Sequence, residues 1–425
     1  MRGFGGYIIY LLGIVLSSVS LIASMTDILD LFPQYAEELK LLRKTAREFA
    51  QRNFSPELAR ELDKREEFPW DLYRKAGELG LLAPSIPTEY NGGGFSTYLA
   101  DIVVTEELVR AEPTLGIAIM SGTFSSHILY FFGTEEQKKK YLPPVYRGET
   151  TFFGAYTEPE HGTDITQLNT IAERKGDKFI IRGMKTFITN APTAKYGVLL
   201  AQTDPEKKHR GQTLFIIHTD WPGVTVRKLT GKMGQRAIPV GEIYLDNVEV
   251  PIDYVVGGEK GINQGFYWTL AYFNISRLGP AAIALGLMLS AFDKALEYAK
   301  KRVQFGQPII NFQLIQEKLG RMAMLIEAAR SLVYRAAYYV DDYIKFKIDP
   351  RAMAAITSAA KVFATEVANQ VIDDAIQIHG GYGYFEEFDV ERYWRDHRVT
   401  RIYEGTNEIN LLTIVDALRR EVWKP

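Results

Sequence analysis

The segment RIYEGTNEI, residues 401–409, contains the side chain with the clearest capacity for proton chemistry. Glu404 stands there between a bulky aromatic residue, Tyr403, and the most flexible residue, Gly405. A surface loop tolerates a carboxylate in such a place, and that is the simplest interpretation. A general base needs one, because burial against an aromatic ring raises the pKa of a carboxyl group toward neutral pH. The rest of the sequence has to decide between the two.

Hydroxyl and amide side chains gather beside aromatic residues in two further segments. These are AYTEPEHGTDITQLNT, residues 155–170, and KTFITNAP, residues 185–192. Such polar groups can hydrogen-bond the edge of a flat polar ring while an aromatic side chain covers its face. Taken singly, Thr157 and Thr189 are ordinary strand threonines, which are common on a half-exposed sheet. Taken together, the two segments favour a ligand site.

A third group of polar and glycine residues lies in RVQFGQPIINFQ, residues 302–313, and QIHGGYGY, residues 377–384. Arg302 stands at a helix–turn–helix junction, where it can clamp a phosphate through two hydrogen bonds. The alternative is a cation that faces the negative end of a helix dipole. Gly380 and Gly381 either cap a helix or let the backbone approach a ligand closely.

Three regions of the chain differ in their hydrophobic pattern. Residues 27–148 repeat apolar side chains at helical spacing. Residues 150–250 contain short alternating runs such as KFIIRG and TLFIIHT, with a hairpin turn at residues 175–177. Residues 262–422 return to long amphipathic stretches broken by glycine and proline. The pattern predicts a mainly α fold with a middle β domain of barrel or sandwich type and a C-terminal four-helix bundle. We place the domain boundaries at 25–149, 150–258 and 259–425.

The composition excludes several classes of protein. With 425 residues, 46% of them apolar, the chain can bury a substantial core. A formal net charge of −2 gives no positive surface of the kind on which nucleic-acid binding depends, so we expect no nucleic-acid partner. No cysteine is present, which excludes thiolate chemistry, disulfides and cysteine-ligated metals. The six histidines show no metal-ligand spacing, and we expect no metal site.

Residues 1–24 form a hydrophobic N-terminal extension with three open interpretations. The stretch after Arg2 is uncharged and long enough to span a bilayer as an anchor. It also has the features of a signal peptide, with an apolar run followed by the small residues Ala23 and Ser24. In the third interpretation the natural start is Met25 and the extension lies upstream of it. From Asp27 onward the sequence has the features of a cytoplasmic enzyme.

Six motifs together resemble the acyl-CoA dehydrogenase family. In chain order they are TEPEHGTD, KTFITNA, KMGQR, RVQFGQPI, QIHGGYGY and IYEGTNEI. The similarity extends over residues 28–422. It implies an N-terminal helical domain, a middle β domain and a C-terminal four-helix bundle that bind FAD. It also implies the oxidation of acyl-CoA thioesters to trans-2-enoyl-CoA, a reaction of fatty acid β-oxidation in lipid metabolism.

The resemblance implies that the two β-domain segments contact the flavin. Tyr156 and Thr157 match the segment along the ring, and Thr163 matches a position beside both the flavin and the thioester. Phe187 takes a place often held by Trp, stacked against the flavin face. Thr189 matches the hydroxyl that meets the flavin N5 region.

The resemblance also implies cofactor contacts from the C-terminal region. Those to the FAD of a neighbouring subunit are Arg302, Phe305 and Gln313, with Gln377, Gly380 and Gly381 along its adenosine-diphosphate part. Further cofactor contacts are Thr406 and Glu408. Because such contacts cross subunits, the resemblance implies a homo-oligomer, usually a tetramer built as a dimer of dimers.

Glu404 matches the catalytic base of the family. The α-hydrogen of a thioester is far less acidic than a carboxylic acid, so the carbonyl must be polarised as the proton leaves. The family uses the backbone N–H at the Glu404 position and a ribityl hydroxyl of FAD. Glu404 then takes the α-proton while the β-hydride passes to flavin N5. A minority of the family supplies the base from a bundle helix, at a position that is Ser276 here, and a serine cannot act as that base.

Substrate contacts are implied for Thr163, Asn274, Arg277 and Gly405. Gly405 leaves room for the thioester to lie against the backbone. Asn274 replaces an acidic residue that many members carry near the pantetheine, whereas Arg277 is kept. Asn410-Leu411 replaces a frequent Gln-Arg pair, which removes a CoA contact.

Three functions remain as hypotheses. The first is an acyl-CoA dehydrogenase that passes electrons to an electron-transferring flavoprotein. The second keeps the fold and changes the acceptor, as in an acyl-CoA oxidase or a flavin monooxygenase; oxidases are often longer, and monooxygenases usually lack the glutamate. The third is a DNA-associated flavin-containing stress protein, which needs a basic surface that the near-neutral charge does not provide.

Overall fold

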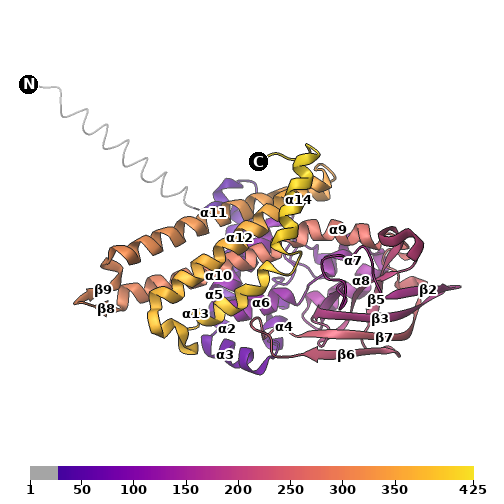
Figure 1. The fold of residues 1–425 in the computed structure, drawn as a ribbon, viewed down its shortest axis with the longest axis horizontal. Helices are drawn as coiled ribbons and strands as arrows, with labels where there is room; N and C mark the ends of the chain where they lie inside the picture. The colour runs from indigo at the N-terminus through magenta and orange to yellow at the C-terminus, as the bar shows by residue number, and fades with distance from the viewer. Residues whose placement is uncertain (1–26) are drawn as a thin grey trace, which may run out of the picture.

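The computed structural model describes residues 27–425, in which a helical region is followed by a sheet and then by long helices (Figure 1). The predictions about residues 1–24 lie outside the described residues. The predicted order of a helical region, a β region and a helical bundle is confirmed. The helices of the first region are α2 (Ala36–Asn53), α3 (Pro56–Arg65), α4 (Trp70–Glu78), α5 (Leu99–Ala111), α6 (Pro113–Ser121), α7 (Ser126–Phe132) and α8 (Glu135–Tyr146).

Side-chain caps fix where several of these helices begin. Ser55 accepts a hydrogen bond from the N–H of Leu58 at the start of α3. Thr134 and Gln137 form a reciprocal capping box at the start of α8. The carboxylate of Glu112 accepts from the N–H of Leu115 at the start of α6, where a negative charge also faces the positive end of the helix dipole.

The middle region is one seven-stranded mixed sheet. Its order is β1-β4-β2-β3-β7-β6, with β5 paired to β4. The predicted turn at residues 175–177 closes the antiparallel β2–β3 hairpin, in which Lys175 faces Lys178. The strands are β1 (Thr151–Ala155), β2 (Ile171–Lys175), β3 (Lys178–Thr189), β4 (Ala194–Gln202), β5 (Gln212–His218), β6 (Val224–Leu229) and β7 (Val240–Pro251).

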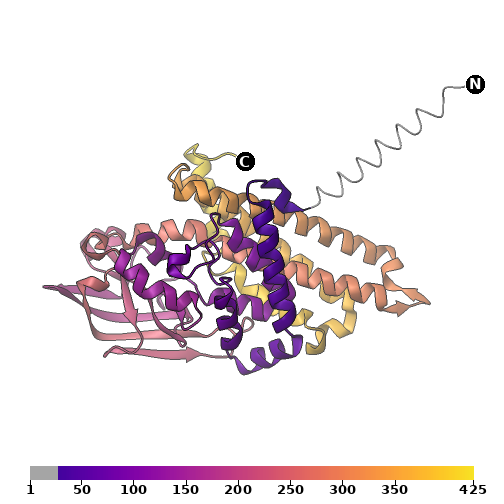
Figure 2. The same cartoon turned by 180° about the vertical axis from the view of Figure 1, so that it is seen from behind.

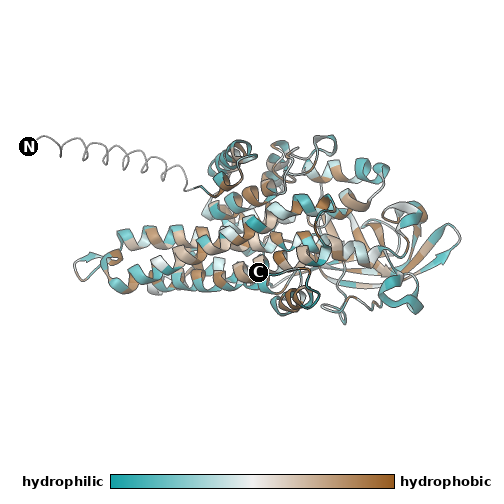
Figure 3. Ribbon diagram, turned by 90° about the horizontal axis from the view of Figure 1, so that it is seen from above, coloured by the Kyte–Doolittle hydropathy of each residue, from teal (hydrophilic) through white to brown (hydrophobic). Residues whose placement is uncertain are grey.

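The C-terminal region is built from long helices that pack on α5. Hydrophobic and hydrophilic residues alternate along these helices, as amphipathic packing requires (Figure 3). One buried apolar core joins α2 and α5 to the bundle, and α2 covers α5 from the side seen in Figure 2. The helices are α9 (Gly265–Ser276), α10 (Leu278–Lys301), α11 (Gln313–Ile344), α12 (Pro350–His379), α13 (Val390–His397) and α14 (Asn407–Arg419). A small hairpin of β8 (Val303–Gln304) and β9 (Gln307–Pro308) connects α10 to α11.

Two apolar stretches of the described chain have the length and hydropathy of membrane spans. They are Pro113–Phe132 and Gly265–Lys301, and 61% and 83% of their most apolar windows are buried inside the fold. Burial of this extent identifies them as core helices.

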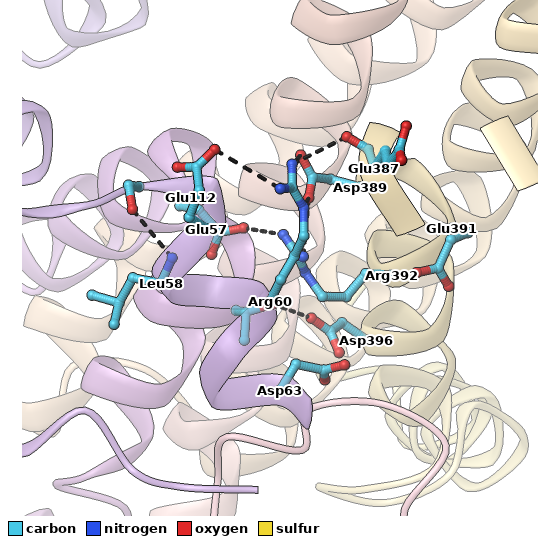
Figure 4. A network of polar contacts seen from close by, with 12 residues as sticks. Glu57, Leu58, Arg60, Asp63, Glu112, Glu387, Asp389, Glu391, Arg392 and Asp396 are labelled. Atoms are coloured by element: carbon cyan, nitrogen blue, oxygen red, sulfur yellow. Dashed lines mark hydrogen bonds and ion pairs between the residues drawn. The ribbon is translucent and has the colours of Figure 1, made fainter. Parts of the chain in front are cut away.

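A buried ionic network joins α3, the start of α6 and α13 (Figure 4). The guanidinium of Arg392 pairs with Glu112 at 2.6 Å and with Asp389 at 3.0 Å, and all three side chains are almost fully buried. Asp389 also accepts from Arg60 at 2.8 Å and Lys294 at 2.9 Å. The network ties the first helical region to the segment that leads to Glu404.

Asp101 lies at the start of α5 with one hydrogen bond to its carboxylate, from the N–H of Ser85 at 3.1 Å. Burial raises the pKa of its carboxyl group to about 7, from an ordinary value of 3.8. At pH values between 3.8 and about 7, the Asp101 carboxyl group is protonated in the folded protein and ionised in the unfolded chain. The free energy of unfolding therefore falls as the pH rises through this window.

We expect Asp101→Asn to remove this pH dependence. Asparagine keeps an acceptor for Ser85 and carries no charge. The variant should match the wild type at pH 4 and exceed its free energy of unfolding at pH 8 by up to about 4 kcal/mol. Thermal unfolding followed by circular dichroism at both pH values measures the difference. An equal difference at pH 4 and pH 8 would contradict the assignment.

Candidate active site

Glu404 lies in a tight turn between the segment Arg398–Arg401 and helix α14. Its φ is 56°, and that of Gly405 is 79°, so two consecutive residues adopt the left-handed conformation. A side chain other than glycine pays about 1–3 kcal/mol for such a conformation and keeps it only where its surroundings determine it. Thr406 then caps α14 by accepting from the N–H of Ile409 at 3.4 Å.

Burial and neighbouring groups shift the pKa of the Glu404 carboxyl group in opposite directions. Burial raises its pKa and outweighs three effects that lower it: a hydrogen bond from Ser276 and the positive charges of Arg277 and Lys361. The Ser276 hydroxyl donates to Oε2 at 2.5 Å. The result is a carboxyl group with a raised pKa, as a general base requires.

Three buried tyrosines respond to the charge of the same carboxylate. Burial raises the pKa of the phenols of Tyr98, Tyr156 and Tyr272, and the negative charge of Glu404 adds to the rise. Tyr156 meets the ring of Phe273 edge to face, with the centroids 5.2 Å apart. These aromatic side chains come from the start of α5, from α9 and from the segment after β1.

The β-domain segments present polar groups and one exposed ring at the ends of β1 and β3. Phe187 is 70% exposed and has a φ of 57°, so its ring is held out from the sheet. Thr157 and Thr189 are half-buried, and Thr163 is exposed in the loop that follows β1. An exposed aromatic face beside hydroxyl groups suits a flat polar ring such as a flavin.

A buried ion pair fixes the loop that carries Thr157 and Thr163. The ammonium of Lys185 donates to the carboxylate of Glu158 at 2.8 Å and to the carbonyl of Tyr156 at 2.9 Å. The same carboxylate accepts the backbone N–H groups of Asn169 and Thr170. The loop is thus tied at both ends, and its polar groups are held in place before any ligand arrives.

A concavity of about 800 Å³ lies at the end of the bundle that carries the β8–β9 hairpin. The Arg302 guanidinium lies 5.4 Å from the ring centroid of Tyr382, and no ion pair of Arg302 occurs within residues 27–425. A Cβ added at Gly380 or Gly381 meets nothing within 4 Å, so the backbone there is open to a ligand. These features suit a phosphate-bearing group. The remaining lining residues include Ile378, His379 and Phe388, together with Glu386 and Glu387.

The other predicted contacts of this end are also exposed. Phe305, at the tip of the β8–β9 hairpin, is 94% exposed, and Gln313 and Gln377 lie on the surface. Thr406 and Glu408 lie instead beside Glu404 at the start of α14. The hairpin and the β domain occupy opposite ends of the chain in Figure 1. One chain therefore does not bring the two predicted groups of cofactor contacts together.

Asn274 and Arg277 are both buried. Asn274 donates to the carbonyl of Pro350 at 3.2 Å, and Arg277 donates to the hydroxyl of Ser358 at 3.3 Å. Burial lowers the pKa of Arg277 to about 10, while the charge of Glu404 acts in the opposite direction. In the isolated chain both residues contact protein groups, and the predicted role in substrate binding stays a prediction.

Sequence reasoning missed two residues beside Glu404, Lys361 and the inward-facing Asn410. Lys361 is fully buried on α12, and its Nζ lies 2.9 Å from the carbonyl oxygen of Gly405. Asn410 donates to the same oxygen at 2.8 Å. The available signal was the spacing of Ser358, Lys361 and Thr365 on one face of an alanine-rich helix.

Comparison with known proteins gives a consistent picture over almost the whole described chain. Three family models match: the N-terminal domain of acyl-CoA dehydrogenase over residues 36–149, the middle domain over 154–248 and the C-terminal domain over 263–419. The 3-(aryl)acrylate reductase of Clostridium sporogenes is 40% identical over 90% of this chain and 99% of its own length. The CarC subunit of the caffeyl-CoA reductase–Etf complex of Acetobacterium woodii is 35% identical, over 91% and 100% of the two chains. The structure of butyryl-CoA dehydrogenase from Megasphaera elsdenii superposes with a TM-score of 0.83 at 36% identity, over 90% and 98% of the two chains.

Proposed function

Because this chain belongs to the acyl-CoA dehydrogenase family, whose members are FAD-dependent oxidoreductases, we propose that it oxidises an acyl-CoA thioester to trans-2-enoyl-CoA with Glu404 as the base. The observation that carries the proposal is the strained, partly buried turn that holds the Glu404 carboxylate with a raised pKa among aromatic rings. Backbone strain combined with a pKa raised by burial is typical of catalytic carboxylates.

The reaction requires Glu404 to move one proton. The carboxylate accepts the proton from the α-carbon of the thioester, and burial favours its protonated form afterwards. The hydroxyl of Ser276 orients Oε2, and the charge of Arg277 opposes the rise in pKa that burial causes and so favours the ionised carboxylate. The backbone N–H of Glu404 is the proposed donor to the thioester oxygen, as charge develops there. FAD, when bound, supplies the acceptor of the β-hydride.

The residues that fit FAD are those of the two open regions described above. On the β domain these are Tyr156, Thr157, Thr163, Phe187 and Thr189. At the other end of the bundle they are Arg302, Phe305, Gln313, Gln377, Gly380 and Gly381, with Thr406 and Glu408 beside Glu404. Because the two regions lie at opposite ends of one chain, we propose a homo-oligomer, a tetramer in our preferred arrangement, in which two copies complete each site.

The proposed electron acceptor is an electron-transferring flavoprotein, and the proposed location is the cytoplasm. One relative is named as part of a complex with such a flavoprotein, which supports this acceptor over molecular oxygen. An oxidase is the alternative that keeps the same fold. Oxygen consumption with the best substrate separates the two, because an oxidase reduces oxygen at the rate at which it oxidises the thioester.

A second candidate for the substrate is a 3-arylpropanoyl-CoA, with the enzyme acting in the direction of oxidation or of reduction. The specific observation is a group of buried tyrosines, Tyr98, Tyr156 and Tyr272, whose phenol pKa values are raised by burial and further by the charge of Glu404. Aromatic side chains pack well on an aromatic acyl group. Two relatives are named for aryl substrates, which supports the same candidate.

An anaerobic titration tests the proposal. The FAD-loaded protein is mixed with butyryl-, octanoyl-, palmitoyl- and 3-phenylpropanoyl-CoA in separate cuvettes, and the flavin absorbance is recorded. We expect at least one ester to bleach the flavin band, and the fastest one to identify the acyl class. If none of the four bleaches a protein that contains FAD, the acyl-CoA assignment fails.

We expect Ser276→Ala to change the pH dependence of kcat/KM. The hydroxyl lowers the pKa of Glu404, so its loss raises that pKa and moves the acid limb of the profile to higher pH. Activity should fall about 3- to 10-fold at pH 6 and approach the wild-type value at pH 9. A uniform loss at all pH values would show that the hydroxyl does not act on the ionisation of Glu404.

A further inference from the structure

Helix α12 turns three buried polar side chains toward the loop that carries Glu404. Ser358, Lys361 and Thr365 are spaced three and four positions apart and therefore share one face of the helix. None of the three is exposed. A helix that packs in a core normally presents apolar side chains at such positions. Burying three polar side chains there is costly unless each has a hydrogen-bond partner.

Each of the three side chains binds the segment that begins at Gly405. The hydroxyl of Ser358 donates to Oδ1 of Asn410 at 2.8 Å, and Thr365 exchanges hydrogen bonds with Asn407. The ammonium of Lys361 donates to the carbonyl of Gly405 at 2.9 Å and to Oδ1 of Asn407 at 2.7 Å. Lys361 is therefore the one member of the face that holds both a backbone and a side-chain oxygen of the loop.

The carbonyl of Gly405 is the anchor point of the strained turn. It accepts from Lys361 and also from Nδ2 of Asn410, at 2.8 Å. Asn410 donates further to the carbonyl of Thr406 at 3.0 Å. Two donors on one carbonyl oppose relaxation of the left-handed residues that precede it. Removing the stronger donor, the charged one, should allow the turn to relax.

The charge of Lys361 is retained although burial opposes it. No carboxylate lies within ion-pair distance of its Nζ in residues 27–425, and burial lowers the pKa of the ammonium to about 8. The charge of Glu404 favours the ammonium, as do those of Glu408 and Glu366, while Arg277 opposes it. The buried ammonium of Lys361 therefore serves the loop that carries Glu404, to which it is hydrogen-bonded.

We propose that Lys361 is a positioning residue for the catalytic carboxylate: its ammonium holds the carbonyl of Gly405 and the side chain of Asn407, and so fixes the turn that presents Glu404. The inference rests on the function proposed above for Glu404. It has two consequences, one on the geometry of the turn and one on the ionisation of the carboxyl group. The charged groups that face Glu404 are Arg277 at the α9–α10 junction and Lys361 on α12, and the phenols are Tyr98, Tyr156, Tyr272 and Tyr403.

The test compares the FAD-loaded full chain with its Lys361→Met variant, which keeps the length of the side chain and removes the charge. Infrared spectroscopy follows the carboxyl stretch of Glu404 as the pH is changed, and its absence in Glu404→Gln identifies the band. We expect the titration midpoint in Lys361→Met to lie at higher pH than in the wild type. We also expect kcat at pH 7 to fall about 10- to 100-fold, with less than a threefold change in KM.

Thr365→Val is the matched control, because it removes a polar partner of Asn407 from the same helix face without changing the charge. Its infrared midpoint should coincide with that of the wild type. Lys361→Gln, which keeps a donor, should recover part of kcat but not the midpoint. An unchanged midpoint and kcat in Lys361→Met would overturn the proposal. So would a failure of both Lys361 variants to give folded protein with FAD, since the lysine would then serve folding.

The infrared midpoint needs no turnover, so it separates this inference from the proposed function. If no acyl-CoA reduces the wild type, the proposed function fails. A midpoint that still shifts in Lys361→Met would then leave the link between Lys361 and Glu404 in place, and an unshifted midpoint would remove it as well.

Discussion

Glu404→Gln is expected to lower kcat by about 10³-fold or more without lowering the FAD content or the thermal midpoint. Glutamine fits the same turn and still accepts the hydrogen bond that Ser276 donates to Oε2. It cannot take a proton from the α-carbon, and Ser276 cannot replace it. The loss should therefore fall on the chemical step and not on substrate binding. Rapid mixing with the best acyl-CoA under anaerobic conditions measures the rate at which the flavin band bleaches.

The control for this variant is Glu173→Gln, which makes the same chemical change on an exposed position of β2. It should bleach at the wild-type rate. A Glu404→Gln protein that bleaches within tenfold of the wild type would mean that another group removes the proton. The assignment of Glu404 would then be wrong even if the enzyme proved to be a dehydrogenase.

Arg392→Met is expected to have the largest effect on stability. Arg392 neutralises two carboxylates, Glu112 and Asp389, in a region where all three side chains are almost fully buried (Figure 4). Methionine leaves the carboxylates without this partner. Breaking a buried ion pair in this way costs about 3–5 kcal/mol of unfolding free energy. Chemical unfolding followed by tryptophan fluorescence measures the change.

The effect of Arg392→Met should also depend on pH. Burial already raises the pKa of Glu112 to about 7, although the guanidinium of Arg392 acts against the rise. Without that cation the carboxyl group will take up a proton more readily, and its protonated form tolerates burial. The variant should therefore lose more stability at pH 8 than at pH 6. Arg420→Met, which breaks an exposed pair with Asp416, is the control and should change stability by less than about 0.5 kcal/mol. A loss below 1 kcal/mol in Arg392→Met would contradict the role given to the network.

The order of the fold could be predicted because local pattern decides it. Apolar spacing of 3.6 residues before residue 148 and after residue 262, with alternation between them, leaves few other arrangements. The turn at residues 175–177 was predictable for the same reason, since it depends only on neighbouring residues. Glu404 could be proposed as the base because its whole motif is contiguous in sequence.

The surroundings of Glu404 could not be predicted in the same way, because they come from distant parts of the chain. Lys361 lies 43 positions before Glu404, and although its spacing from Ser358 and Thr365 indicates a shared helix face, the local sequence does not show that this face meets the Glu404 loop. Arg277 was expected to meet the substrate, which stays a prediction; the structure adds that it donates to Ser358 and that its charge lowers the pKa of Glu404. Asn410 was counted as a lost CoA contact, and it proves to be a buried support of the turn. Such roles depend on which helix packs on which, and local sequence does not contain that information.

The central claim is that Glu404 takes the α-proton. The most direct measurement is the anaerobic single-turnover rate of flavin bleaching with an acyl-CoA deuterated at the α-carbon, compared with the unlabelled ester in the wild type and in Glu404→Gln. The account predicts a slower rate with the deuterated ester in the wild type and almost no bleaching with either ester in the variant. Equal rates for the two esters, together with bleaching that persists in Glu404→Gln, would contradict it.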